Sequence, residues 1–193
     1  MLALLISQPL AASANDLRIT PYLGYRVGGE FKDFTTGTRL KLDEGDSYGL
    51  IVGWGEEDIY EVLYSQQPSK LNASGPVSSG SLFDVNVTNI MFHSKNVLDR
   101  ESGGFVSGMV GITHFDPDFG GLSTDTRFAL GAGGGFDYPI NNRLSLRLEG
   151  RAIATFMDSN SGIFCSSSSG CAIYTNSSVL WQFEAVTGFT FKF

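Results

Sequence analysis

The sequence lacks the segments that would place it among helical membrane proteins or nucleic-acid-binding proteins. None of its 193 residues belong to an apolar run of the roughly eighteen residues that a transmembrane helix needs. Its 13 Lys and Arg are outnumbered by 20 Asp and Glu, which gives a net charge of −7. Because binding to nucleic-acid phosphates needs a basic surface, we expect no nucleic-acid partner.

Cofactor and metal motifs are also missing. The glycine run from Gly131 to Gly135 lacks the G-x-G-x-x-G spacing and the helix start of a phosphate-binding loop. No further Cys or close His completes a zinc site with the two cysteines, and no EF-hand spacing links the acidic residues. We therefore expect no cofactor and no metal, and we expect solvation rather than Ca²⁺ or Mg²⁺ binding for the acidic loop residues. These are Asp43, Glu44, Asp46, Asp116, Asp118 and Asp125.

Glycine and aromatic residues are abundant instead. The 24 Gly, 15 Phe and 7 Tyr are typical of aromatic-rich strands with glycine at bends or crowded positions. Mean hydropathy is only +0.02, as expected when each strand carries apolar side chains at alternate positions. This composition favours β-structure over helices.

The last stretch, residues 179–193, alternates most clearly. One row of alternate positions is nearly all apolar, whereas the other carries both charged residues, Glu184 and Lys192. A period of two indicates a β-strand. Ordinary globular strands have about five or six residues, whereas a tilted strand that crosses a bilayer needs roughly ten, with apolar residues outward and aromatic residues at both ends. The stretch therefore predicts a transmembrane strand.

Seven earlier stretches alternate similarly, which gives eight predicted strands. They are 17–28, 40–54, 59–66, 82–93, 104–114, 124–138, 143–157 and 179–193. Tight turns are expected at 55–58 and 139–142, and longer loops at 67–80 and 158–178. Leu40, Leu42 and Tyr48 share parity, so we expect them on one face. The parity slips after Val87, which predicts either a bulge near Asn89 or inward-pointing apolar residues.

Together these features predict an all-β fold, an eight-stranded antiparallel up-and-down transmembrane β-barrel. An even number of strands lets the sheet close and leave no edge in lipid. A water-soluble barrel would place apolar residues inside and charges outside. Here the larger row is aromatic and aliphatic while the other row carries Arg and Glu, which favours the membrane barrel.

The first fourteen residues, 1–14, are predicted to be a signal peptide. They contain an apolar core and end in the small residues Ala12-Ser13-Ala14, so the mature chain is expected to start at Asn15. A basic n-region is missing, which suggests a truncated segment or a start codon placed too late. No Cys follows the cleavage region, so we expect no lipoprotein anchor. The barrel domain is predicted to span residues 15–193.

The chain resembles the small outer-membrane barrels of the OmpA-transmembrane, OmpX and OmpW type. The resemblance is carried by the signal peptide, the eight alternating stretches, and the terminal Phe189-Thr-Phe191-Lys-Phe193, which is similar to the export signature of that class. Stretches 19–26 and 147–151 also resemble proteobacterial outer-membrane β-barrel domains. The resemblance implies a location in the bacterial outer membrane. It also implies that Phe189, Phe191 and Phe193 are the signal read by the assembly machinery.

A row of charged residues is predicted to face the barrel interior. An eight-stranded barrel leaves room for side chains and little more. Charges there are costly unless they are paired, so we expect an Arg/Glu network that plugs the lumen rather than a gated pore. The predicted network is Arg26, Glu61, Arg127, Arg147, Glu149, Arg151, Glu184 and Lys192.

The two cysteines are predicted to form a disulfide. Cys165 and Cys171 flank a Ser/Gly spacer in the last external loop of an exported chain. Closing so short a loop is expected to contribute roughly 2 kcal/mol. The loop 158–178 is the expected site of contact with a surface partner.

The two histidines offer little for catalysis. His93 and His114 lie on different stretches, with His93 expected at the periplasmic end and His114 nearer the external rim. Some eight-stranded outer-membrane barrels are lipid A deacylases that use His, Ser and Glu. Adjacent His93 and Ser94 face opposite sides of a strand, however, and His114 lacks an aligned Ser. We therefore expect no enzymatic activity.

The sequence thus predicts a non-enzymatic structural or surface-interaction barrel with a closed polar lumen. A narrow channel or carrier for small solutes, like those of the OmpW type, is the alternative, and a lipid-modifying enzyme is a third. The expected partners are outer-membrane lipid and lipopolysaccharide, the assembly machinery, and a surface partner. The barrel is expected to be a monomer.

Overall fold

The computed structural model describes residues 17–32, 38–55, 58–74, 79–99, 102–157, 161–166, 170–175 and 179–193. Side chains are described for these residues except 31, 32, 58, 79 and those in 161–175. The predicted signal peptide lies outside the described residues. In the described part of the chain, no helix has the length and apolar character to cross a membrane.

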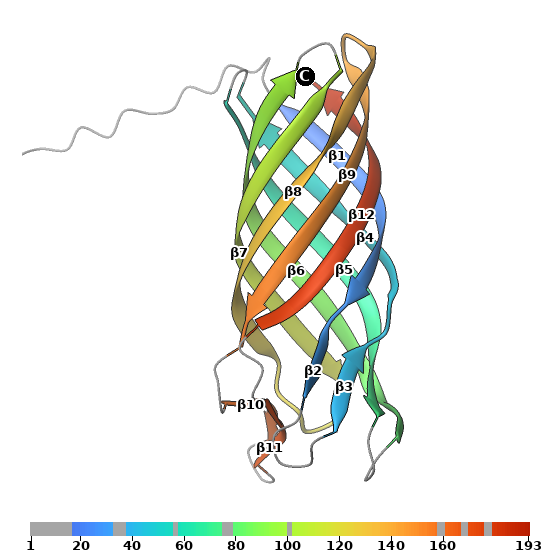
Figure 1. Ribbon diagram of the computed structural model, residues 1–193, viewed down its shortest axis with the longest axis vertical. Helices are drawn as coiled ribbons and strands as arrows, with labels where there is room; N and C mark the ends of the chain where they lie inside the picture. The colour runs from blue at the N-terminus through green and yellow to red at the C-terminus, as the bar shows by residue number, and fades with distance from the viewer. Residues whose placement is uncertain are drawn as a thin grey trace, which may run out of the picture.

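Eight long antiparallel strands form a closed barrel (Figure 1). Each pairs with the next long strand in sequence, the last pairs with the first, and the pairing of β5 with β6 completes the ring. The strands are β1 (Arg18–Gly28), β4 (Gly45–Trp54), β5 (Asp58–Ser74), β6 (Ser79–Asp99), β7 (Gly104–Asp118), β8 (Asp125–Asn141), β9 (Leu144–Phe156) and β12 (Val179–Lys192). The predicted up-and-down barrel is confirmed.

Four short strands lie at one end of the barrel, the lower end in Figure 1. β2 (Glu30–Lys32) pairs with β3 (Arg39–Leu42), and β3 continues onto β5. β10 (Ser161–Ser166) and β11 (Gly170–Thr175) form a separate hairpin inside the predicted loop 158–178. The opposite end carries the tight β8–β9 turn and the C-terminus. Short turns face the periplasm in transmembrane barrels, so the two ends are called external and periplasmic below.

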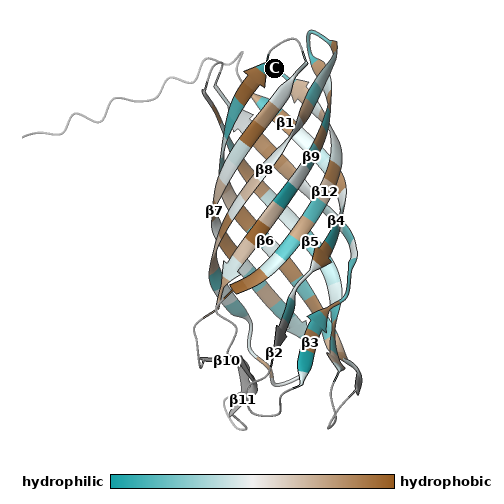
Figure 2. Ribbon diagram, viewed as in Figure 1, coloured by the Kyte–Doolittle hydropathy of each residue, from teal (hydrophilic) through white to brown (hydrophobic). Residues whose placement is uncertain are grey.

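The barrel surface carries an apolar belt in its middle and periplasmic parts. Outward side chains such as Leu23, Phe128, Trp181 and Phe183 are about half exposed, whereas inward Arg26 is fully buried. Figure 2 shows the resulting alternation of hydrophobic and hydrophilic positions along the strands. The predicted pattern, with apolar side chains outward and polar side chains inward, is therefore confirmed in these parts of the barrel. An apolar outer surface of this kind is favourable when it is covered by hydrocarbon.

The external section of the barrel has the opposite pattern. Its interior holds an apolar cluster, here called the external core, while outward positions there include Lys70, Asp84 and Asp118. This is the pattern of a water-soluble barrel. The external core consists of Leu40, Leu42, Leu71, Ala73, Val85, Val87, Phe115, Met157 and Leu180. The barrel therefore projects beyond the membrane on the external side.

This change of pattern explains three differences between the predicted and the observed strands. The predicted loop 67–80 is wrong, because β5 continues to Ser74 and β6 begins at Ser79. Leu40 and Leu42 do not share a face with Tyr48, because the break between β3 and β4 turns both leucines inward. Pairing of β6 is regular through the expected bulge site near Asn89, and the second alternative holds, with Val85 and Val87 pointing inward.

A polar row marks the outer boundary of the belt. Tyr48 and Tyr64 both donate to Gln66 Oε1, at 3.1 and 3.3 Å, and His114 Nδ1 lies 2.7 Å from Thr126 Oγ1. All five side chains lie on the barrel exterior near the level where the outward positions become polar. Tyrosines at this depth are typical of membrane interfaces.

Candidate functional site

The barrel lumen is the candidate site because it contains nearly all the buried charge. Inward positions alternate along each strand, so charged residues distant in sequence meet inside the ring. Arg26, Glu61, Arg147, Arg151 and Glu184 are each at most 3% exposed. They form two groups, one toward the periplasmic end and one near the middle.

Glu61 on β5 is the centre of the periplasmic group. Both its carboxylate oxygens accept hydrogen bonds from Arg147 of β9, Nη1 to Oε1 at 2.7 Å and Nη2 to Oε2 at 2.9 Å. His93 Nδ1 lies 2.8 Å from Glu61 Oε2, and Lys95 Nζ lies 3.7 Å from Oε1. A bidentate Arg–carboxylate pair is strong and has a defined geometry. Glu61 thus ties β5, β6 and β9 together across the lumen.

The rest of this group surrounds Phe105. Arg147 Nε donates to Glu149 Oε2 at 3.0 Å, and Lys95 donates to Asp137. Phe105 is 2% exposed, and Lys95 and Arg147 both lie over its ring, with Nζ at 4.7 Å and Cζ at 4.8 Å from the ring centroid. Two cations over one ring hold it by cation–π attraction. Phe105 is therefore packed against the cations of the periplasmic group.

Glu184 on β12 is the centre of the middle group. Its Oε1 accepts from Arg26 Nη2 at 3.0 Å, and its Oε2 lies 2.8 Å from Arg151 Nε. Arg26 also donates to Ser65 Oγ, and the Arg151 guanidinium lies 4.7 Å from the Tyr22 ring centroid. One carboxylate therefore joins cations from β1 and β9.

Hydrogen bonds extend the middle group toward the external core. With the Asn89 amide oriented to accept from Arg26 Nη1 at 2.9 Å, its nitrogen donates to Thr113 Oγ1 at 2.7 Å. Thr113 Oγ1 lies 2.8 Å from Thr155 Oγ1. All of these side chains are buried. The polar network thus reaches from Phe105 to the middle of the barrel, and the external core lies beyond it.

The two groups are balanced in charge only when taken together, because the periplasmic group has one more carboxylate than cations and the middle group one more cation than carboxylates. Four cations face four carboxylates, leaving His93 aside: Arg26, Lys95, Arg147 and Arg151 against Glu61, Asp137, Glu149 and Glu184. A buried charge is tolerated only when it is paired and hydrogen-bonded. The balance fits a packed interior.

Glycine makes room for this network on β8. Gly133 faces Arg151 across the β8–β9 ladder. A Cβ on Gly133 would lie 3.0 Å from Ser107 Oγ and 3.1 Å from Glu149 Oε1. Both contacts are tighter than normal, so a side chain here would displace the network.

Two residues of the predicted network lie nearer the two ends of the barrel. Arg127 pairs with Asp125 at 2.8 Å near the external end of β8. Lys192 is on the inward row at the periplasmic mouth, opposite Arg18. Arg26, Glu61, Arg147, Glu149, Arg151 and Glu184 are brought together as described above.

Sequence reasoning missed His93, Lys95, Asp137 and Phe105. His93 and Lys95 have the same parity as Val85 and Val87 on β6, and all four are inward. Reading β6 as one continuous strand would have placed His93 and Lys95 in the lumen.

Sites for other chemistry are few in the described part of the chain. No group of three or more His, Cys, Asp or Glu residues there could hold a metal ion. In the β10–β11 hairpin Cys165 is the register partner of Cys171. Their side chains lie outside those described, so the disulfide stays a prediction.

Comparison with known proteins places the fold. No family model matches the sequence, and no curated protein matches it significantly. Among solved structures, the chain is similar to neisserial surface protein A, with a TM-score of 0.63 and 15% identity over 94% of this chain and 98% of that one. It is also similar to the outer-membrane protein OprG from Pseudomonas aeruginosa, with a TM-score of 0.56 and 14% identity over 93% and 96%. For the outer-membrane protein AlkL the TM-score is 0.52, with 13% identity over 95% and 93%.

The chain has the same fold as small bacterial outer-membrane β-barrels. The expected resemblance to this class is confirmed by these structures and by the closed barrel of eight long antiparallel strands. At such low identity the similarity extends to the fold alone.

Proposed function

We propose that the protein is a non-enzymatic outer-membrane barrel with a closed lumen, and that its role is structural or in surface interaction. The observation that carries this proposal is the packing of the lumen. The charged network is paired, the external core seals it on one side, and Phe105 fills the periplasmic side. Water or solutes could pass through the barrel only by displacing both the external core and Phe105.

A solute-flux assay tests the closed lumen. Proteoliposomes containing the folded protein are placed in an isosmotic solution of a pentose, and swelling is followed by light scattering. The proposal predicts the same rate as for empty liposomes. Swelling that rises with the amount of folded protein, and that does not occur with heat-denatured protein, would refute it.

A narrow channel or carrier for small solutes is the second candidate. It is favoured by polar atoms in the lumen that have no hydrogen-bond partner among the described residues. They include Nη1 and Nη2 of Arg151 and both polar side-chain atoms of Gln182. Such atoms could exchange hydrogen bonds with a passing solute. A swelling rate that changes in Arg151→Gln would favour this candidate.

We also propose that the protein does not modify lipid. His114 lies on the barrel exterior beside Thr126, without an acidic residue in an ion pair to it among the described contacts. Expression in a Gram-negative host should leave the mass of lipid A unchanged. A mass shift that disappears in His114→Ala would contradict this.

The proposed partners follow from the surfaces of the barrel. Lipid and lipopolysaccharide would cover the belt, and the assembly machinery would read the outward row Phe189, Phe191 and Phe193, which are about half exposed. Loop 158–178 would meet a surface partner. Crosslinking from this loop in intact cells tests the last of these, and no crosslinked product would exclude it.

A further inference from the structure

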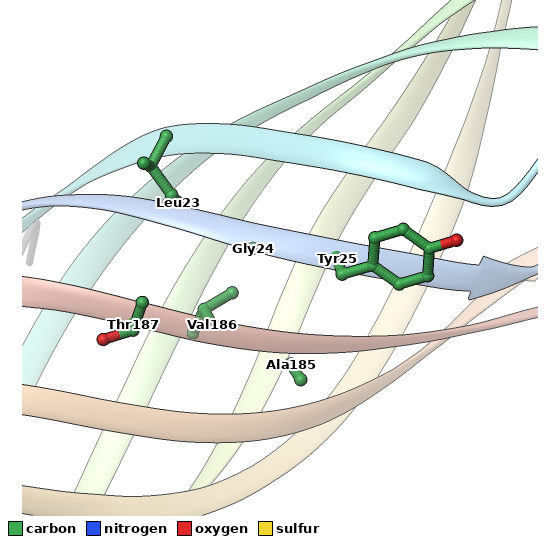
Figure 3. Close-up of a pocket in the computed structure, with 6 residues that line it drawn as sticks. All are labelled: Leu23, Gly24, Tyr25, Ala185, Val186 and Thr187. Carbon is green, nitrogen blue, oxygen red and sulfur yellow. The ribbon is translucent and has the colours of Figure 1, made fainter.

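Two cations face each other at the periplasmic mouth of the barrel. Arg18 on β1 and Lys192 on β12 are register partners. Figure 3 shows these two strands side by side farther into the barrel, where Leu23 and Tyr25 of β1 are exposed on the outer surface. Arg18 has the parity of the buried residue Thr20 instead, so it lies on the inward row, as Lys192 does. Directly opposite residues on one face of a ladder have Cβ atoms about 5 Å apart.

Neither cation pairs with a carboxylate in the described part of the chain. The carboxylates of the lumen pair with the four cations of the charged network, and Arg18 and Lys192 are not among these. Arg18 Nη1 is buried and has no hydrogen-bond partner among the described residues. Like charges directly opposite each other in a ladder are destabilising. An anion held between the two side chains would offset this repulsion.

Hydroxyl groups lie immediately inside the two cations. Thr20 and Thr190 are two residues farther along the inward rows of β1 and β12, and their Oγ1 atoms are 2.8 Å apart. One hydroxyl donates to the other, so the second keeps a proton that is free to donate. Ser145 on β9 is the register partner of Thr190 and is 1% exposed. Its Oγ has no hydrogen-bond partner among the described residues, so it is another free donor, and leaving it unpaired in a buried place is costly.

The mouth is open to solvent and locally basic. Arg18 and Lys192 are partly exposed, whereas Ser145 lies deeper. Arg143, at the start of β9, is exposed, and its carbonyl accepts a hydrogen bond from the Lys192 backbone N–H at 2.9 Å, which adds a third positive charge at this end. The whole chain has a net charge of −7. The concentration of cations is therefore a feature of this mouth and does not reflect a generally basic protein.

We infer that Arg18, Lys192 and Ser145 form a binding site for a phosphate group at the periplasmic mouth. A guanidinium fork fits two phosphate oxygens, and a lysine ammonium binds phosphate as a point charge. The donors come from three strands, which suits the three or more oxygens of a phosphate better than the two oxygens of a carboxylate. The phosphate belongs either to a free solute of the periplasm or to a phospholipid headgroup of the periplasmic leaflet. The site needs no passage through the lumen, so it is independent of the proposed function.

Titration calorimetry tests the inference. The folded protein in a non-ionic detergent is titrated with inorganic phosphate and, separately, with glycerophosphoglycerol, the headgroup of phosphatidylglycerol, at constant ionic strength. Wild type should bind one phosphate group per chain. Arg18→Gln and Lys192→Gln should each weaken binding by about tenfold, because each removes a charged donor, and Ser145→Ala should weaken it less. Tighter binding of inorganic phosphate assigns the site to a free solute, and tighter binding of the glycerol diester assigns it to a lipid headgroup.

Arg39→Gln is the matched control. Arg39 is an exposed cation at the external end, 3.9 Å from Glu30, so its replacement changes the net charge equally and should leave phosphate binding unchanged. The inference is overturned if wild type binds neither probe, or if Arg18→Gln and Lys192→Gln bind phosphate as tightly as wild type. It is also overturned if Arg39→Gln weakens binding as much as they do, because the attraction would then be to net charge alone.

The urea midpoint gives a second readout that a purely structural role would not produce. Phosphate should raise the midpoint of wild type, because a ligand that binds only the folded state stabilises it, and should not raise that of Lys192→Gln. Without phosphate, Lys192→Gln should be at least as stable as wild type, because it removes one of two facing like charges. A lower midpoint for this variant without phosphate, together with an equal phosphate effect on both proteins, would overturn the inference.

Discussion

At the scale of single residues, the defining feature is the burial of charge in the lumen. Glu61 and Glu184 each accept contacts from two or more cationic or imidazole groups on other strands. Each carboxylate therefore offsets the cost of burying its partners. Replacing one leaves its partners uncompensated.

Glu61→Gln should destabilise the folded barrel by roughly 3–5 kcal/mol, because Arg147 then remains buried without a full counter-charge. The measurement is the urea midpoint of refolded protein in detergent micelles, monitored by heat-modifiable migration. Glu44→Gln is the control, because Glu44 pairs with Lys41 on the exposed surface, and its midpoint should hardly move. Equal midpoints for Glu61→Gln and wild type would contradict a tightly paired network.

The alternation of residues along each strand predicts which side chains of the site point inward, but not which of them meet. Alternation alone placed Arg26, Arg147, Arg151 and Glu184 on the inward row. It could not tell which strands meet across the lumen, because that depends on barrel closure and stagger. The Arg147–Glu61 pair, 86 residues apart in sequence, is a product of that closure.

At the scale of elements, β6 shows how one strand serves two environments. Its inward positions change from Val85 and Val87 to His93 and Lys95, while its outward positions change from Asp84 and Asn86 to Ile90 and Phe92. The sequence left two explanations open, a bulge near Asn89 or inward-pointing apolar residues, because one environment was assumed for the whole strand, and the second is the one observed. The register is continuous, and only the surroundings change.

Lysine substitutions on the outward face of β6 should report the membrane boundary. Ile90→Lys places a charge in the outer part of the apolar belt, beside Tyr64, and should cost more than Asn86→Lys, with about 2–4 kcal/mol, the cost of a lysine at the midplane, as the upper limit. Asn86 lies four residues from Ile90 on the same outward face of β6. Asn86→Lys should cost little stability because this position lies in the polar external section. Urea midpoints of the two variants measure the difference. Equal losses would show that the belt extends over the external section.

The β10–β11 hairpin was not predicted, because a serine-rich stretch gives no clear alternation. Its register makes Cys165 and Cys171 partners, and a disulfide between them stays a prediction. Protein purified without reductant should show no mass increase with iodoacetamide under denaturing conditions, and a gain of two carbamidomethyl groups after reduction. Alkylation of both cysteines without reduction would exclude the bond.

At the scale of the whole molecule, one closed sheet has two parts with opposite patterns. Apolar side chains point outward in the belt and inward in the external section. The number of strands, their up-and-down order and their apolar belt were predicted from alternation. The extent of the external section was not, because its polar outer face reads as loop in sequence while its apolar residues point inward. Closure of the ring brings the external core and Phe105 to the two ends of one charge network.

Single-channel recording in planar bilayers tests the central claim, a lumen closed by packed side chains, most directly. Wild-type protein inserted in folded form should give no discrete current steps in 1 M KCl at moderate voltage, and neither should the conservative variant Glu184→Gln. Reproducible unitary current steps from the wild type that are abolished or altered in amplitude by Glu184→Gln or Arg151→Gln would contradict a closed lumen. Ions would then be passing through the charged network.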